Sequence, residues 1–80
     1  MKILAIDDER YALQMLVETL HKVRPEAEII PFRRASQFLE YEAKDTFDAA
    51  FLDIRIGKMS GIQVAIELKK SSPHCNIVFV

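Results

Sequence analysis

Short apolar runs alternate with amphipathic stretches along the whole chain, and this alternation restricts the possible folds more than any other feature. Residues 2–6 and 48–52 are apolar on both faces, which is typical of strands inside a parallel sheet. Residues 27–32 and 76–80 are two further strand candidates, and Pro31 indicates that 27–32 is an edge strand or ends there. Four strands are therefore expected.

The segments between these strands have the apolar spacing of helices. One helix is predicted over 9–24, a second over about 37–44 with Ser36 as its N-cap, and a third that ends near residue 70. The third helix begins with a capping box at 60–63. The order β-α-β-α-β-α-β predicts an α/β fold, a doubly wound parallel sheet with right-handed crossovers.

Composition excludes several classes of protein. The chain has 80 residues, enough for one domain, and 11 basic against 12 acidic side chains give a net charge of -1. Bulk charge therefore indicates neither a nucleic-acid nor a membrane partner. The single cysteine, Cys75, has no partner for an intrachain disulfide, and no run has the length of a membrane span or of a signal peptide. A cytoplasmic location is expected.

Acidic residues follow two of the predicted strands. Asp7 and Asp8 come directly after 2–6, and Asp53 comes directly after 48–52. If these strands are neighbours, the three carboxylates converge, because the carboxyl ends of parallel strands meet at one edge. One like-charge pair about 4 Å apart costs about 4 kcal/mol at an effective dielectric constant of about 20. A cation would neutralise the cluster, and all-oxygen ligands favour Mg²⁺ over zinc.

Simpler interpretations remain open for each acid. Asp8 could be the N-cap of the first helix, with Glu9 in its first turn, and Asp53 could be a turn residue. The loop at 6–10 has no glycine, which argues against a dinucleotide-binding cradle. Its acids would repel phosphate, and a phosphoryl group would therefore bind through a metal.

These residues resemble the receiver domain of bacterial two-component response regulators, and the resemblance covers the whole chain. The motifs are residues 3–9, residues 51–54, Met59, Gly61 eight residues after Asp53, and residues 77–80. The resemblance implies a flavodoxin-like fold with strand order 2-1-3-4 for the four strands. The fifth strand and the last two helices of the family would be absent, so residues 1–80 are expected to be a receiver domain that is incomplete at its C-terminus.

The resemblance also implies roles for individual residues. Asp53 would be the phosphoacceptor, and a sensor histidine kinase would be the phosphoryl donor. Mg²⁺ would be held by Asp7, Asp8, Asp53 and the backbone carbonyl of Arg55, with Asp7 acting mainly through water. Enzymatic activity would be limited to weak self-phosphorylation and autophosphatase activity. Gly57 stands where the family most often has proline, which does not weaken the assignment.

Two functional groups of the family fall beyond Val80: the switch hydroxyl after the fourth strand and the lysine after the fifth. Lys58 is not placed to replace that lysine and is interpreted as a solvated charge. The fourth strand would be an uncovered apolar edge, so we expect either a fragment of a longer receiver domain or a chain that completes its sheet by self-association through this strand. A C-terminal DNA-binding effector domain, and hence a role in transcription regulation, is expected in the parent protein.

Two alternative functions remain. A Mg²⁺-dependent phosphohydrolase with an aspartate nucleophile would share the acidic cluster, but such enzymes usually carry a second acid two residues later, where this chain has Arg55. A receiver-like interaction module that is never phosphorylated is the other alternative.

Overall fold

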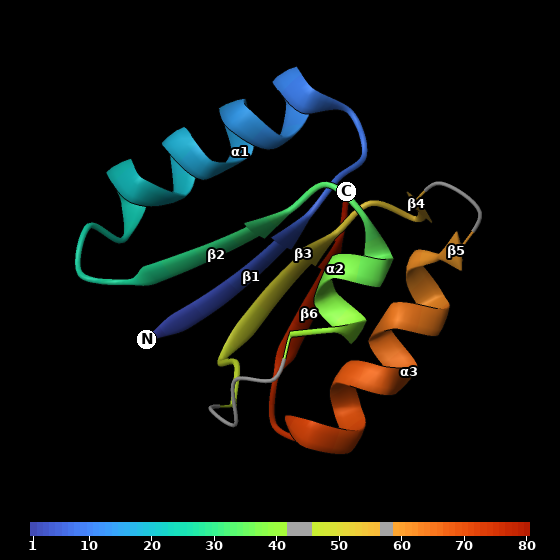
Figure 1. The fold of residues 1–80 in the computed structure, drawn as a ribbon. Coiled ribbons are helices and arrows are strands. Elements are labelled where there is room, and N and C mark those ends of the chain that lie inside the picture. Colours follow the sequence, from blue (N-terminus) through green and yellow to red (C-terminus); the bar gives the residue numbers. More distant parts are fainter. Residues whose placement is uncertain (42–45, 57–58) are drawn as a thin grey trace.

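A four-stranded parallel sheet forms the centre of the computed structural model, which describes residues 1–41, 46–56 and 59–80 (Figure 1). The strands lie in the order β2-β1-β3-β6, which confirms the predicted order of the four strands. The elements are β1 (Lys2–Ile6), α1 (Arg10–Val23), β2 (Glu28–Phe32), α2 (Ala35–Leu39), β3 (Ala49–Leu52), β4 (Arg55–Ile56), β5 (Met59–Ser60), α3 (Gly61–Ser71) and β6 (Asn76–Phe79).

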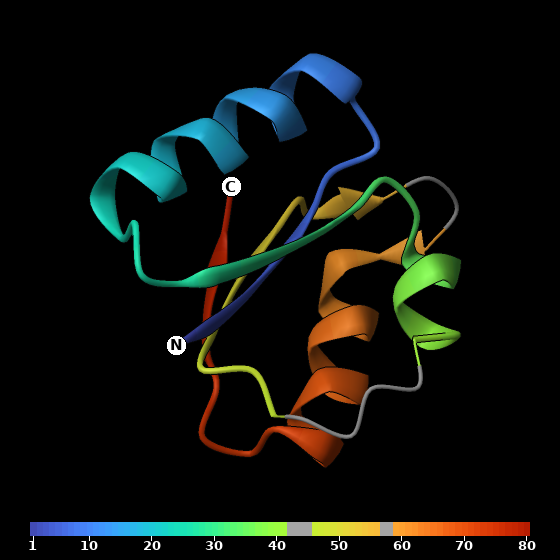
Figure 2. The ribbon, with the colours of Figure 1, turned by 60° about the vertical axis from the view of Figure 1, so that its left-hand side comes forward.

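Helices cover both faces of the sheet. Helix α1 lies on one face, where it packs on β1 and β2, and α2 and α3 lie on the other face (Figures 1 and 2). Among the described residues, no helix is both long and apolar enough to cross a membrane.

The larger core lies between the sheet and the α2–α3 layer. Its fully buried side chains include Leu4, Ile6, Leu52, Val64 and Leu68. A smaller core on the α1 side contains Ile3, Leu20 and Ala27. Burial of apolar area contributes roughly 25 cal/mol per Å², so the larger core contributes more to stability than the smaller one.

The second helix differs from the prediction. It spans Ala35–Leu39, so Ser36 lies inside the helix and Arg34 is the N-cap residue. The reason is Gln37, whose side-chain oxygen accepts hydrogen bonds from the backbone N–H groups of Arg33 (3.0 Å) and Arg34 (3.1 Å). These bonds start the helix earlier in the chain than Ser36 would. Residues 42–44, predicted as its last turn, lie outside the described residues.

The start of α3 confirms the predicted capping box. The Ser60 hydroxyl accepts a hydrogen bond from the N–H of Ile62 (3.1 Å), and the Gln63 side-chain oxygen accepts one from the N–H of Ser60 (3.1 Å). The antiparallel pair formed by β4 and β5 just before this helix was not predicted. Strands of two residues are too short to show a periodic pattern.

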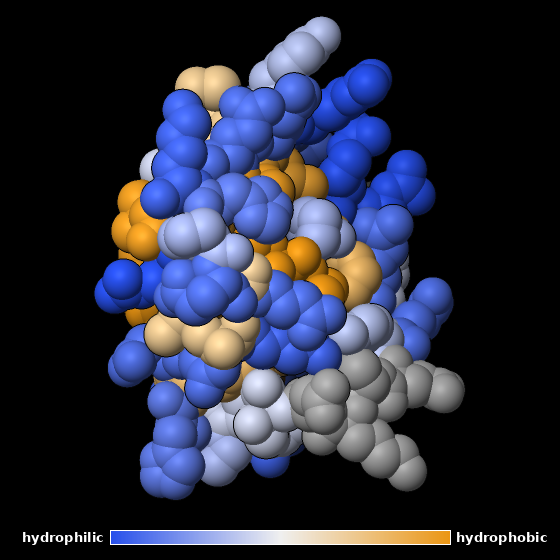
Figure 3. Space-filling view, turned by 90° about the vertical axis from the view of Figure 1, so that its left-hand side faces the viewer, coloured by the Kyte–Doolittle hydropathy of each residue, from blue (hydrophilic) through white to orange (hydrophobic). Residues whose placement is uncertain are grey.

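Figure 3 shows the side of the molecule that lies on the left in Figure 1. Its surface is mainly hydrophilic, with smaller hydrophobic areas between the hydrophilic residues. Most of this part of the surface is therefore suited to contact with water.

The two faces of α3 allow a matched test of the core. We expect Leu68→Ala to lower the free energy of unfolding by about 2–5 kcal/mol, because it leaves a cavity under a fully buried side chain. Ile66→Ala on the same helix should change it by less than about 0.5 kcal/mol, because Ile66 is 57% exposed. Urea unfolding followed by circular dichroism measures both, and equal losses would contradict this description of the core.

Candidate functional site

Strand pairing brings the three predicted acids to one edge of the sheet. Strands β1 and β3 pair in parallel with Ile6 opposite Leu52, so the residues that follow them emerge side by side. The N–H of Asp53 donates to the carbonyl of Ile6 (3.0 Å), and the N–H of Asp7 donates to the carbonyl of Phe32 (3.2 Å). The backbone of the site is thus anchored to both neighbours of β1 and does not depend on a flexible loop.

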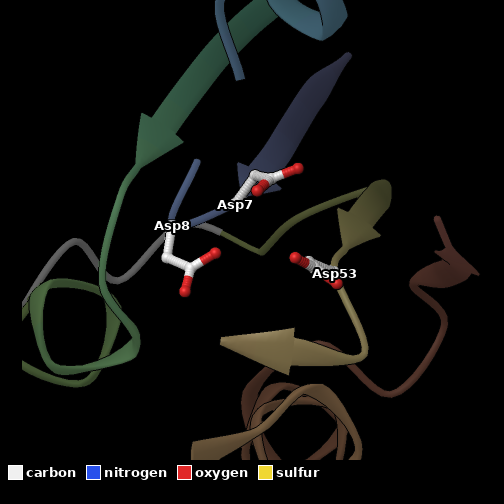
Figure 4. Close-up of side chains that lie close together, drawn as sticks. All are labelled: Asp7, Asp8 and Asp53. Atoms are coloured by element: carbon white, nitrogen blue, oxygen red, sulfur yellow. The ribbon is translucent and has the colours of Figure 1, made fainter. Parts of the chain in front are cut away.

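The carboxylates of Asp7, Asp8 and Asp53 form one cluster (Figure 4). Each contributes an oxygen atom, and these oxygens all lie within 4.8 Å of one another. Asp7 is buried, Asp53 is half-buried and Asp8 is exposed, so the cluster opens to solvent on one side. Three hard oxygen donors at this spacing, with solvent access for bound waters, fit Mg²⁺.

Two backbone hydrogen bonds orient the carboxylates. The N–H of Glu9 donates to Oδ1 of Asp7 (2.9 Å), and the N–H of Arg55 donates to Oδ1 of Asp53 (3.1 Å). In each case an aspartate side chain accepts from the backbone two residues later, which holds the side chain over its own turn. The orientation of both acids is therefore fixed locally.

The electrostatics of the site favour a cation. Burial raises the pKa of the Asp7 carboxyl above its ordinary value, and the negative charges of Asp53 and Asp8 raise it further, while the hydrogen bond from Glu9 lowers it. Among the described residues, no lysine or arginine forms an ion pair with Asp7 or Asp53. The described chain does not itself supply a counter-charge to these two acids.

The interpretation of Asp8 as the N-cap of α1 is wrong. The N-cap is Glu9, whose carboxylate accepts from the N–H groups of Tyr11 (3.2 Å) and Ala12 (2.7 Å). The longer glutamate side chain reaches two backbone N–H groups that have no partner within the helix. The preference for short cap residues did not suggest this role.

The carboxylates of Asp8 and Asp53 are directed toward each other (Figure 4).

A glycine is required where α3 approaches Asp53. A Cβ atom on Gly61 would collide with the backbone carbonyl of Asp53 and lie 3.1 Å from the Cα of Ile54. The N–H of Gly61 donates to the carbonyl of Ile54 (2.7 Å). The spacing of eight residues from Asp53 to Gly61 therefore has a steric cause, which the sequence alone did not reveal.

The remaining site predictions concern the loop after Asp53. Arg55 begins β4, and its side chain is exposed. Its carbonyl stays a predicted metal ligand. Gly57 and Lys58 lie outside the described residues.

Comparison with known proteins assigns the chain to a family. The model of the response regulator receiver domain matches residues 3–80, and the chain belongs to this family. Receiver domains are signalling modules, in general without enzymatic function.

The relatives share the fold over nearly the whole chain. A curated relative, "Stress response regulator protein 1" of Meyerozyma guilliermondii, is 29% identical over 80 residues, which are 99% of this chain and 37% of that protein. The BeF3-activated receiver domain of DrrB has a TM-score of 0.83 at 23% identity, with 98% of this chain and 62% of that one covered. The Thermotoga maritima response regulator TrrA, solved in complex with Mg(2+)-BeF, has a TM-score of 0.80 at 28% identity, with 98% and 66% covered. The chain thus spans from about a third to two thirds of the length of these relatives.

We expect Gly61→Ala to destabilise the protein, although alanine favours helices by about 1 kcal/mol over glycine. The added Cβ must displace either the start of α3 or the backbone at Asp53, and the latter also disturbs the acidic cluster. Thermal unfolding and Mg²⁺ titration measure the two effects. Ile62→Ala, at the exposed next position, is the control and should change neither by much. A more stable Gly61→Ala variant with unchanged Mg²⁺ affinity would contradict the close approach.

The raised pKa of Asp7 predicts a pH dependence of stability. A carboxyl whose pKa is higher in the folded state favours folding when protonated, and this contribution is lost as the pH rises from the ordinary value of 3.8 through the raised one. At neutral pH without metal, Asp7→Asn should therefore be more stable than the wild type, because asparagine can still accept the hydrogen bond from Glu9. The difference should disappear at pH 3.

Urea unfolding at pH 7 and pH 3 in the presence of a chelator measures this difference. A second arm adds Mg²⁺, which should stabilise the wild type by about 2.7 kcal/mol at 100 times its dissociation constant and stabilise Asp7→Asn less. A wild type that is more stable than Asp7→Asn at pH 7 without metal would contradict the electrostatic description.

Proposed function

We propose that this chain accepts a phosphoryl group on Asp53 from a sensor histidine kinase, as the receiver domain of a response regulator. The observation that carries the proposal is the cluster of three carboxylate oxygens within 4.8 Å, built from the ends of two paired strands. A carboxylate oxygen of Asp53 forms the new P–O bond, while the P–N bond to the kinase histidine breaks and its electron pair stays on the imidazole nitrogen.

The chain's own groups suit this reaction. In the proposal Asp7, Asp8, Asp53 and the carbonyl of Arg55 hold Mg²⁺, with Asp7 acting mainly through water. When bound, Mg²⁺ offsets the charge that gathers on the phosphoryl oxygens. The N–H of Arg55 holds Oδ1 of Asp53 at 3.1 Å, which orients the carboxylate for attack. The complex of TrrA with Mg(2+)-BeF supports this assignment by similarity.

Asp53 is the best placed of the three acids to be the acceptor. Asp7 is buried, so an incoming phosphorus atom has little access to it, and Asp8 lies on the exposed side beyond the end of β1. Asp53 is half-buried at the end of β3, less enclosed than Asp7 and less exposed than Asp8. Its position combines access for the donor with close negative ligands for a metal.

The partner proposals rest on the relatives and on the surface near the site. TrrA has been solved in complex with the histidine kinase ThkA, which supports a kinase as partner for this chain. Tyr11 and Met15, 70% and 64% exposed, present apolar surface on α1, the helix that follows Asp7 and Asp8 in the chain. DrrB is described as an OmpR/PhoB homologue, which supports a DNA-binding effector domain and transcription regulation in a longer parent protein. A cytoplasmic location and weak self-phosphorylation belong to the same proposal.

Phosphorylation by a small donor tests the proposal. With Mg²⁺ and acetyl phosphate, the wild type should gain the mass of one phosphoryl group, and the adduct should be lost at alkaline pH. Asp53→Asn should abolish the adduct, because the amide is not a nucleophile. Asp48→Asn, the same change at the other end of β3, is the matched control and should be labelled like the wild type.

Three results would contradict the proposal. Labelling of Asp53→Asn would place the acceptor elsewhere, and turnover of varied phosphate esters would favour the phosphohydrolase. A folded chain that neither binds Mg²⁺ nor becomes labelled would favour the interaction module.

A further inference from the structure

The backbone N–H group that orients Asp7 belongs to a residue outside the helices and strands. Glu9 donates this hydrogen bond to Oδ1 of Asp7 (2.9 Å), and Glu9 lies between the end of β1 and the start of α1. The corresponding donor for Asp53 is Arg55, which is held in place by the pairing of β4 with β5. Because Glu9 lies outside the strands, pairing cannot hold its N–H in place. The position of this N–H therefore depends on the other contacts of Glu9.

Three hydrogen bonds tie Glu9 to the first turn of α1. Its Oε1 accepts from the N–H of Tyr11 (3.2 Å), and its Oε2 accepts from the N–H of Ala12 (2.7 Å). Its backbone carbonyl accepts from the N–H of Leu13 (3.0 Å). Leu13 is buried, and α1 packs on β1 and β2. Glu9 is therefore fixed to a helix that is itself anchored on the sheet.

We propose that Glu9 is a positioning residue for the acidic site, because its hydrogen bonds to α1 hold its own N–H against Oδ1 of Asp7. The inference rests on the proposed function, in which Asp7 helps to hold Mg²⁺. Glu9 is not itself a member of the cluster, since among the described residues the oxygens within 4.8 Å of one another come from Asp7, Asp8 and Asp53. Without the Glu9 carboxylate, the first turn of α1 loses its cap and the Asp7 carboxylate loses its fixed orientation.

The hydrogen bonds of Glu9, rather than its charge, are the feature that serves the site. Both carboxylate oxygens accept from N–H groups at the start of α1, where the helix dipole favours a negative charge. Glu9 is exposed, so solvent ions screen its charge at the cluster. Geometry and charge can be separated by mutation, because Glu9→Gln removes the charge but leaves an oxygen that can accept from the helix.

The affinity of the chain for Mg²⁺, measured by isothermal titration calorimetry, tests the proposal. Glu9→Ala should raise the dissociation constant about tenfold, an effect typical of residues that orient metal ligands. Glu9→Asp and Glu9→Gln should stay within about threefold of the wild type, because each keeps an oxygen that can accept from the first turn. Equal weakening in the Ala and Gln variants would assign the effect to charge, and equal weakening in all three would make Glu9 a ligand. Either result would overturn the proposal.

A matched control separates positioning from the stability of α1. Ala12→Gly lies in the same turn at an exposed position, and it keeps the N–H that donates to Glu9. It should destabilise the helix to a similar degree as Glu9→Ala, because glycine disfavours a helix about as much as the loss of a cap does. Urea unfolding without metal checks this match. The Mg²⁺ affinity of Ala12→Gly should equal that of the wild type, and a loss as large as in Glu9→Ala would overturn the proposal.

A double-mutant cycle shows whether Glu9 acts through Asp7. Asp7→Ala removes the acceptor, so adding Glu9→Ala to it should change the dissociation constant of Mg²⁺ by less than about twofold. A further loss of about tenfold in the double variant would show that Glu9 acts by another route and would contradict the proposal.

Failure of this inference and failure of the phosphoryl proposal are distinguishable. A wild type that is labelled by acetyl phosphate, with unchanged Mg²⁺ affinity in Glu9→Ala, would overturn the positioning role alone. A chain that shows the expected Mg²⁺ affinities but is not labelled would overturn the phosphoryl proposal alone. A wild type that binds no Mg²⁺ would overturn both.

Discussion

The parallel pairing of β1 with β3 is the interaction on which the rest of the molecule depends. It places Ile6 opposite Leu52, both fully buried, and so forces the residues that follow them into contact distance. The apolar burial of the two strands stabilises the arrangement, whereas the carboxylates that follow them repel one another. The fold thus holds together three charges that would otherwise separate. In our proposal a divalent cation offsets this repulsion.

Helix α3 fixes the position of Asp53. Its first residue, Gly61, packs directly against the backbone of Asp53 and bonds to Ile54, while Val64 and Leu68 anchor the same helix in the larger core. Any movement of the helix start is therefore coupled to the acidic cluster. A signalling domain needs a coupling of this kind, because a change of charge at the acidic cluster then affects the position of a packed helix.

Much of the fold and the three acids could be predicted from the sequence, because both depend on strong periodic patterns. Apolar runs of four or five residues mark buried strands, and an acid directly after such a run must emerge at the sheet edge. The predictions were wrong where one side chain determines where a helix begins. The hydrogen bond from Arg34 to Gln37 places the start of α2 earlier than predicted, and Glu9, not Asp8, is the N-cap of α1. The collision that requires Gly61 depends on two segments meeting in space, which no local pattern contains.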